Sequence, residues 1–333
     1  MDTLIYSILL AFVVSLVLGP IVIPLLHKLK FGQQVRDDGP KQHLKKSGTP
    51  TMGGIMMLLA MAVPLAVFCG GSMEFLFMAV VGTAGFGLIG FLDDFLKIRH
   101  KRSLGLRAYQ KIIGQLGVSL VLALWAYHEP LVGSTLYIPF FDVSWELGWF
   151  YVPFMVFVII AVVNSVNLTD GLDGLASGVT LIDAITYAFI FYVLAASAGA
   201  SGDVMLQSNL QNGVVFAGAL AGACLGFLRF NAYPARVFMG DTGSLALGGA
   251  LAVMAMVTRT ALIVPFVGVM FVASSVSVIL QVGSYKLRNK KRVFLMAPLH
   301  HHFELKGYPE TKIVSMYMII TAAMCLLVLL AFV

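Results

Sequence analysis

Ten long apolar runs recur along this sequence and constrain its fold more than any other feature. A helix needs about 20 predominantly apolar residues to cross a hydrocarbon core about 30 Å thick. Apolar residues make up 59% of the 333 residues and charged residues only 11%, too little polar surface for a water-soluble domain. We therefore expect an all-α integral membrane protein, with a single polytopic membrane domain over residues 1–333. The expected transmembrane helices lie near 3–26, 51–69, 75–92, 112–128, 148–166, 176–198, 210–228, 243–257, 261–283 and 312–332.

The lysines and arginines indicate how these helices are oriented. Segments 27–50, 93–111, 229–242 and 284–312 hold 21 of the 22, and Arg259 is the exception. These segments are alternate connections between the expected helices, and cytoplasmic loops carry such an excess of positive charge. We therefore expect both termini to be extracytoplasmic and the basic loops to be cytoplasmic. The first run is too long for a signal-peptide core and follows no basic segment, so it should remain as an anchor.

The opposite side carries the aromatic residues typical of a membrane interface. Trp125, Trp145 and Trp149 all belong to this side. Residues 137–144 have the pattern of a short β-hairpin, although Pro139 weakens that interpretation because proline cannot donate to a strand ladder. We expect no chemistry there.

Two further patterns indicate packing. The three cysteines stand singly in apolar segments, which is typical of buried small side chains rather than of disulfides or zinc sites. Gly218, Gly222 and Gly226 recur every four residues, a spacing that favours close contact between helices.

Asp93 and Asp94 close the third apolar run, and Lys97 follows them. If the helix continues, Lys97 faces both carboxylates, because side chains three and four residues apart share a helical face. A solvated helix end with an ion pair is one interpretation. Paired carboxylates beside a cation also suit metal binding and proton abstraction.

A second polar group ends the fifth run. Asn164, Asn167, Asp170 and Asp173 recur every three residues, so we expect them to line one side of a helical turn. Gly171 and Gly174 allow the chain to turn or a ligand to approach closely. Helix capping explains one such side chain, but four at membrane depth indicate a polar cavity or ligands.

Asp241 is the third acidic point, in a Gly-Asp-Thr-Gly turn directly before an apolar run. It is either the N-cap of the next helix or a ligand for a hard cation. Carboxylates from three separate helix ends can hold one Mg²⁺, which prefers oxygen ligands and bridges to substrate phosphates.

Three consecutive histidines, His300, His301 and His302, precede Glu304 in the last basic segment. This order is not the HExxH spacing that places two zinc ligands on one helical face. Adjacent imidazoles project in different directions on a helix, so recognition of a phosphate or sugar is favoured over a closed metal site.

Lys46 lies just before Thr-Pro-Thr-Met-Gly-Gly, a turn that enters a helix. Backbone N–H groups and a lysine at such a turn can hold an anion, although the order of a P-loop is absent.

Carboxylates, lysines and histidines at the cytoplasmic helix ends together indicate metal-dependent phosphoryl transfer, which depends on positioning and charge neutralisation. Two other functions, secondary transport and intramembrane metal-dependent hydrolysis, would leave different signatures in the sequence. A secondary transporter would show inverted repeats, and none is visible in the sequence. An intramembrane metallohydrolase would need a recognisable set of zinc ligands, and the sequence shows none.

The motifs Asp93-Asp94, NSVNLTDGLDG from Asn164, MGDTGS around Asp241 and APLHHHFELKG resemble the polyprenyl-phosphate N-acetylhexosamine-1-phosphate transferases along essentially the whole chain. KKSGTPTMGG and the three histidines with Glu304 resemble specifically the phospho-N-acetylmuramoyl-pentapeptide transferases of bacteria. This resemblance implies ten helices in the cytoplasmic membrane, an active site facing the cytoplasm and commonly a homodimer. It also implies Mg²⁺ as cofactor and transfer of phospho-MurNAc-pentapeptide from UDP-MurNAc-pentapeptide to undecaprenyl phosphate, giving lipid I and UMP in peptidoglycan synthesis. A nucleic-acid partner is not expected.

The same resemblance implies roles for individual residues. Asp241 is the leading Mg²⁺ ligand, and Asp93 and Asp94 are catalytic candidates, with Asp93 preferred as the base and a covalent aspartyl intermediate as the competing mechanism. Lys97 and Lys111 would bind phosphate or organise the active site. Residues implied in the uridine pocket are Asn167, Asp170, Gly171, Leu172 and Phe238. Further substrate contacts are expected from Lys46, Thr51, Asn164, Asp173, Asn231, Gln281, His300, His301 and His302.

Overall fold

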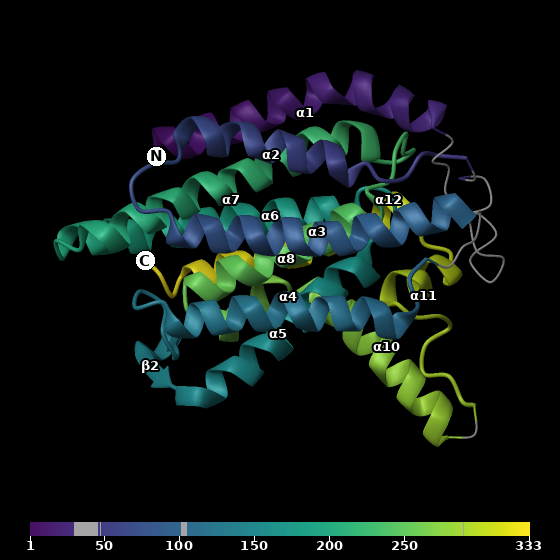
Figure 1. Ribbon diagram of the computed structural model, residues 1–333. Coiled ribbons are helices and arrows are strands. Elements are labelled where there is room, and N and C mark those ends of the chain that lie inside the picture. Colours follow the sequence, from purple (N-terminus) through teal and green to yellow (C-terminus); the bar gives the residue numbers. More distant parts are fainter. Residues whose placement is uncertain (30–45, 47, 101–104, 289) are drawn as a thin grey trace.

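The computed structural model describes residues 1–29, 46, 48–100, 105–288 and 290–333, which form a bundle of helices (Figure 1). Both termini lie at one end of the bundle, and α11 lies near the other end. The helices are α1 (Asp2–Lys28), α2 (Gly54–Phe68), α3 (Glu74–His100), α4 (Ala108–His128), α5 (Tyr151–Thr169), α6 (Leu175–Ala200), α7 (Val204–Asn231), α8 (Gly240–Val257), α9 (Val264–Val267), α10 (Val269–Leu287), α11 (Leu299–Leu305) and α12 (Glu310–Leu329). Two short strands, β1 (Thr135–Ile138) and β2 (Val143–Glu146), and the 3₁₀ turns η2 (Pro139–Phe141), η3 (Gly148–Phe150) and η4 (Ala261–Ile263) complete the described elements.

The prediction of an all-α membrane protein is confirmed. In the part of the chain that the structure describes, nine helices are long and apolar enough to cross a membrane. The second apolar run forms α2, which has only 15 residues and is therefore about 22 Å long at 1.5 Å per residue. Every apolar run that we expected to be a helix contains one.

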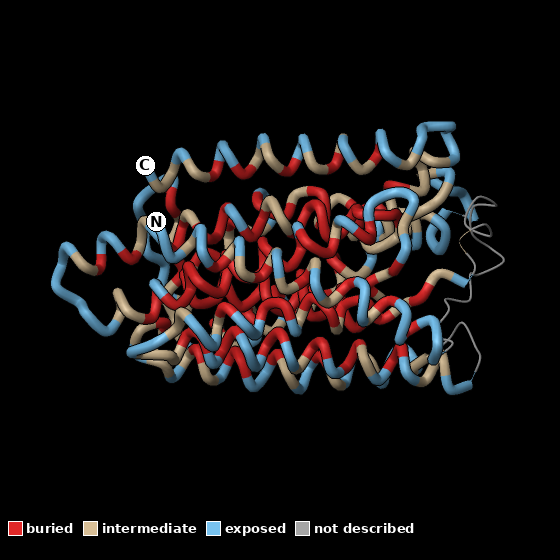
Figure 2. Tube along the Cα trace, turned by 90° about the horizontal axis from the view of Figure 1, so that it is seen from above, coloured by how far each residue is buried: buried red, intermediate tan, exposed pale blue. Residues whose placement is uncertain are grey.

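Helices α7 and α8 form the interior of the bundle. In their most apolar stretches 83% and 89% of the residues are buried, compared with 22% for α1 and for α10. Figure 2 shows this distribution, with buried residues inside and exposed ones along the outer helices. The close helix contact predicted for Gly218, Gly222 and Gly226 is present, and the structure shows that the partner is α1: a Cβ on Gly222 would lie 2.2 Å from the carbonyl oxygen of Ile8.

The ninth apolar run, expected as one helix over 261–283, is interrupted. It begins with η4 and the four-residue α9, and the long helix α10 starts only at Val269 and continues to Leu287. Gly268 separates the two helices with φ −88° and ψ 35°, which is not a helical conformation. The apolar pattern did not indicate this break because both sides of Gly268 are equally apolar.

The predicted hairpin is present. Strands β1 and β2 pair antiparallel, with Thr135 opposite Glu146 and Ile138 opposite Val143, and Pro139 lies in the connecting turn, where no ladder hydrogen bond is required of it. Arg259, the exception to the charge pattern, holds this hairpin. Its Nη2 donates to the carbonyl of Leu131 at 2.5 Å, and its own carbonyl accepts from Tyr137 N–H at 2.8 Å.

Candidate active site

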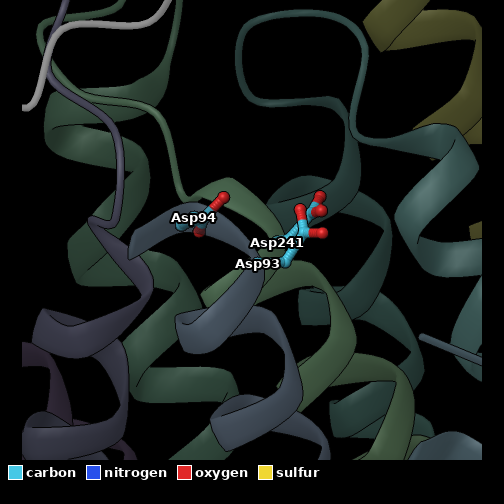
Figure 3. A group of neighbouring side chains, drawn as sticks. All are labelled: Asp93, Asp94 and Asp241. Carbon is cyan, nitrogen blue, oxygen red and sulfur yellow. The ribbon is translucent and has the colours of Figure 1, made fainter. Parts of the chain in front are cut away.

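Three carboxylates meet at one point of the bundle. Asp93 and Asp94 come from α3 and Asp241 comes from the start of α8, and one oxygen of each lies within 4.8 Å of the others (Figure 3). Asp93 and Asp94 are each 3% exposed. Such proximity of buried like charges is costly unless cations compensate for it. The group is therefore suited to binding positive charge.

The close crossing of α3 and α8 creates this arrangement. A Cβ on Gly90 would lie 2.1 Å from the backbone oxygen of Asp241, so only glycine lets the start of α8 approach α3 this closely. Helix α3 continues to His100, eight residues beyond the end of the expected run. The carboxylates therefore project from the side of a continuous helix rather than from its end.

Asp94 caps helix α8 from the neighbouring helix. Its Oδ2 accepts hydrogen bonds from the backbone N–H of Thr242 at 2.9 Å and from the Thr242 hydroxyl at 2.8 Å. Asp241 lies inside α8, whose N-cap position belongs to Met239, and makes no capping hydrogen bond. The alternative interpretation of Asp241 as an N-cap is therefore wrong, and its carboxylate faces the cluster instead.

Two lysines compensate the carboxylates. Lys97 Nζ lies 2.5 Å from Asp93 Oδ2, 2.8 Å from Asp241 Oδ2 and 3.5 Å from Asp94 Oδ1, which confirms that it faces both aspartates of its own helix. Lys111 from α4 donates to the same Asp241 oxygen at 3.0 Å. Two ammonium groups against three carboxylates leave the cluster one formal negative charge.

Asn167 joins this cluster, whereas Asn164 does not. The Asn167 amide donates to Asp241 Oδ1 and to Ser244 Oγ, both at 2.8 Å, and its Oδ1 accepts from Lys111 at 3.3 Å. Asn164 lies one turn deeper and donates to Gln115 Oε1 on α4 at 2.7 Å.

The four polar residues do not line one side of a helical turn, so that expectation is wrong. Helix α5 ends at Thr169 because Asp170 leaves the helical region with φ −76° and ψ 58°, and Asp173 is reached through a turn that includes Gly171. Partial burial, reinforced by the negative charges of Asp241, Asp94 and Asp173, raises the pKa of Asp170 to about 8. Leu172, between these aspartates, is 4% exposed.

The segment before α2 is held against the start of α8. Phe238 N–H donates to the carbonyl of Pro50, and Gly53 N–H donates to the carbonyl of Phe238, both at 2.8 Å. This pairing brings Thr51 to Gly240, where a Cβ would lie 2.7 Å from Thr51 Oγ1 and 2.5 Å from Asp94 Oδ2. Thr51 and Phe238 are therefore neighbours of the carboxylate cluster, on its α2 side.

Asn231 and Gln281 use their polar atoms to hold loops. Asn231 is 3% exposed; its Oδ1 accepts from Gly174 N–H and Ser177 Oγ, and its amide donates to the carbonyl of Val237. Gln281 on α10 forms three hydrogen bonds with the backbone of residues 293–294. Both support the surroundings of the site through the backbone.

The three histidines lie on the seven-residue helix α11 and point in different directions, as expected. His300 is buried against Gly171, where a Cβ would lie 2.3 Å from its Nε2. His301 Nδ1 lies 2.6 Å from Glu304 Oε2. His302 Nδ1 accepts from Leu295 N–H at 3.1 Å, and burial together with the charge of Lys306 lowers its pKa.

The three aspartates are the one group that we find within the described residues with ligand atoms of His, Cys, Asp or Glu close enough for a metal ion. All the donor atoms are carboxylate oxygens, and a cation could replace the ammonium groups of Lys97 and Lys111 as their partner. This donor set fits a hard cation such as Mg²⁺ and does not fit a structural zinc site.

Sequence reasoning missed four residues that organise the site. Thr242 and Ser244 bind the cluster residues Asp94 and Asn167, and Gln115 binds Asn164. Glu310, the first residue of α12, binds Lys46. Their polarity at the ends or interiors of apolar helices was the available signal.

The chain is similar to proteins of a known family. A family model described as glycosyl transferase family 4 matches residues 76–259, which include all three aspartates and Asn167. The phospho-N-acetylmuramoyl-pentapeptide-transferase of Clostridium novyi (strain NT) is 50% identical over 327 residues, which cover 98% of this chain and 96% of that protein. Those of Clostridium kluyveri and Clostridioides difficile (strain 630) are 49% and 50% identical, covering 98% and 96% of this chain and 98% and 94% of theirs.

The chain belongs to the phospho-N-acetylmuramoyl-pentapeptide-transferase family. These relatives align with nearly the whole chain, so the similarity extends beyond residues 76–259. The transferase resemblance found in the sequence motifs is thereby confirmed.

Proposed function

We propose that this protein transfers phospho-MurNAc-pentapeptide from UDP-MurNAc-pentapeptide to undecaprenyl phosphate, giving lipid I and UMP. The observation that carries the proposal is the convergence of Asp93, Asp94 and Lys97, from the C-terminal part of α3, with Asp241 at the start of α8 and Lys111 at the start of α4. A soluble phosphorylated substrate and a lipid substrate can meet at such a place. Membership of the transferase family supports the choice of substrates.

Mg²⁺ is the proposed cofactor, with Asp241 as its leading ligand. Asp241 contacts both lysines and Asn167, whereas Asp93 and Asp94 each contact only one of the two lysines. Bound there, the cation would neutralise charge on the diphosphate and on the departing UMP. Lys97 and Lys111 would then be released to bind phosphate oxygens.

Asp93 is proposed as the base. It accepts a proton from the phosphate of undecaprenyl phosphate, or orients its oxyanion, and that oxygen attacks the β-phosphorus of UDP-MurNAc-pentapeptide. The bond between this phosphorus and the bridging oxygen breaks, and UMP leaves with the electron pair. The alternative is a covalent aspartyl intermediate, in which the carboxylate itself attacks first.

The substrate contacts are proposed from the positions of the surrounding residues. Asn167, Asp170, Gly171, Leu172 and Phe238 flank the cluster and would form the uridine pocket, with Phe238 stacking on the base. The histidines pack against the same turn through His300 and would recognise the sugar phosphate or the peptide. The remaining proposed contacts are Lys46, Thr51, Asn164 and Asp173. Asn231 and Gln281 would contribute through the loops that their side chains hold.

We further propose ten membrane spans in the bacterial cytoplasmic membrane, with both termini outside and the active site facing the cytoplasm. The positions of the termini at one end of the bundle and of α11 near the other end support this orientation, as does the distribution of lysine and arginine. A homodimer in the bilayer is proposed from the family resemblance.

The test is an assay of purified protein with Mg²⁺, undecaprenyl phosphate and UDP-MurNAc-pentapeptide. We expect release of UMP and formation of lipid I, each dependent on all three components. A folded, monodisperse preparation that releases no UMP would contradict the proposal.

A further inference from the structure

Glu310 joins three separate parts of the chain. It is the first residue of α12, and its carboxylate oxygens lie 2.6 and 2.8 Å from Lys46 Nζ. Its Oε1 also accepts the backbone N–H of Asp173 at 2.6 Å. The Glu310 side chain is 11% exposed and that of Lys46 17% exposed, so water screens this interaction only weakly.

Asp173 completes the arrangement from the other side. Its Oδ1 lies 2.7 Å from Lys46 Nζ, and its Oδ2 accepts from Ala235 N–H at 2.9 Å. Burial alone would lower the pKa of Lys46, but the hydrogen bonds and charges of Asp173 and Glu310 outweigh it and raise the pKa. Lys46 therefore remains a cation held between two carboxylates.

The contacts of Lys46 restrict the position of its ammonium group, which matters for the binding of an anion. A lysine carries its charge on a flexible four-carbon stem, so contacts that restrict the position of its ammonium group reduce the entropy lost when it binds a phosphate. Glu310 restricts both Lys46 and the turn that carries Asp170 and Asp173. The segment of Lys46 leads to Thr51, which lies beside Gly240 in the carboxylate cluster. The 170–174 turn follows Asn167, which donates a hydrogen bond to Asp241.

We propose that Glu310 is a positioning residue for the nucleotide sugar: it holds Lys46 and the 170–174 turn in the arrangement that receives the diphosphate and uridine of the donor substrate. This inference rests on the proposed transferase function. Glu310 acts through Lys46 and Asp173, because its own contacts go to these residues and not to the three aspartates.

The decisive variant is Glu310→Gln, which keeps an acceptor for Asp173 N–H but removes the charge that holds Lys46. We expect the KM for UDP-MurNAc-pentapeptide to rise about tenfold, since a charge-assisted contact is lost, while kcat changes by less than about threefold. The KM for undecaprenyl phosphate should stay within about twofold. Thr311→Ala, at the exposed next position of α12, is the matched control and should leave all three constants unchanged.

A double-mutant cycle separates positioning from general structural damage. If Glu310 acts through Lys46, Glu310→Gln should change the donor KM by less than about twofold in a Lys46→Gln background. A purely structural role would instead add its full effect to that of Lys46→Gln. Glu310→Asp keeps the charge on a shorter side chain and should raise the donor KM by only about threefold, which provides a second measurement if Glu310→Gln does not fold.

The outcomes distinguish this inference from the proposed function. Wild-type protein that releases no UMP contradicts the function itself. Wild-type turnover with an unchanged donor KM in Glu310→Gln and Glu310→Asp, or a tenfold effect that persists without Lys46, overturns the positioning role alone.

Discussion

Asp241 joins side chains from three other helices. Its two oxygens accept from Lys97, Lys111 and Asn167, which come from α3, α4 and α5. A neutral side chain at this position would leave both lysines with one fewer anion and would offer a weaker ligand to a metal ion. The effect of its replacement should therefore exceed that of replacing an isolated surface aspartate.

For Asp241→Asn we expect turnover to fall at least about 100-fold and the Mg²⁺ dependence of any remaining activity to shift to higher concentration. UMP release measured across a Mg²⁺ titration checks this. Asp2→Asn, in the exposed first turn of α1, is the control and should behave like the wild type. Turnover that survives in Asp241→Asn with the same Mg²⁺ dependence would argue against the metal assignment.

Asp170 gives a prediction for the pH dependence of stability. Its pKa is raised from 3.8 to about 8 in the folded protein by burial and by the charges of Asp241, Asp94 and Asp173. Between these values the folded state binds a proton that the unfolded state releases. The free energy of unfolding therefore falls as the pH rises from about 4 to about 8.

Asp170→Asn removes this titration, so its thermal unfolding midpoint in metal-free detergent should change less between pH 5 and pH 8 than that of the wild type. The comparison of the two slopes isolates Asp170 from the other carboxylates. Equal slopes would show that Asp170 is already ionised in the folded protein.

At the scale of helices, the apolar runs predicted where helices form because spanning the membrane requires about 20 apolar residues, whatever the partners. They did not predict which helices pack together. The i, i+4 relation of Asp93 and Lys97 was readable locally, whereas Lys46 and Glu310 are 264 residues apart and meet only through the tertiary fold.

The crossing of α3 and α8 can be tested at Gly90. In Gly90→Ala the new methyl group would lie 2.1 Å from the backbone oxygen of Asp241, so α8 must move away from α3. We expect UMP release to fall about 100-fold, because a displacement of about 1 Å at a catalytic group has effects of that size.

Gly117→Ala is the matched control on α4, since nothing lies within 4 Å of its Cβ. This change should preserve activity and stabilise the protein by up to about 1 kcal/mol through helix propensity. Similar activities for the two alanine variants would show that the α3–α8 crossing does not control the geometry of the site.

For the molecule as a whole, charge distribution and fold together predict its orientation. The hairpin with Asp142 lies between α4 and α5, on the side opposite the connections that hold 21 of the 22 lysines and arginines. Lys306 follows the histidine helix, on the basic side. Because moving a basic loop across the membrane is unfavourable, Asp142 should be extracytoplasmic and Lys306 cytoplasmic.

Single cysteines at these two exposed positions, introduced into a Cys69→Ala background, provide the measurement. Cys224 and Cys325 are buried and should not react. A membrane-impermeant thiol reagent should label Asp142→Cys in intact cells and Lys306→Cys only after the membrane is opened. The reverse pattern would place the three aspartates on the outer face, where a cytoplasmic nucleotide sugar cannot reach them, and would therefore contradict both the orientation and the proposed reaction.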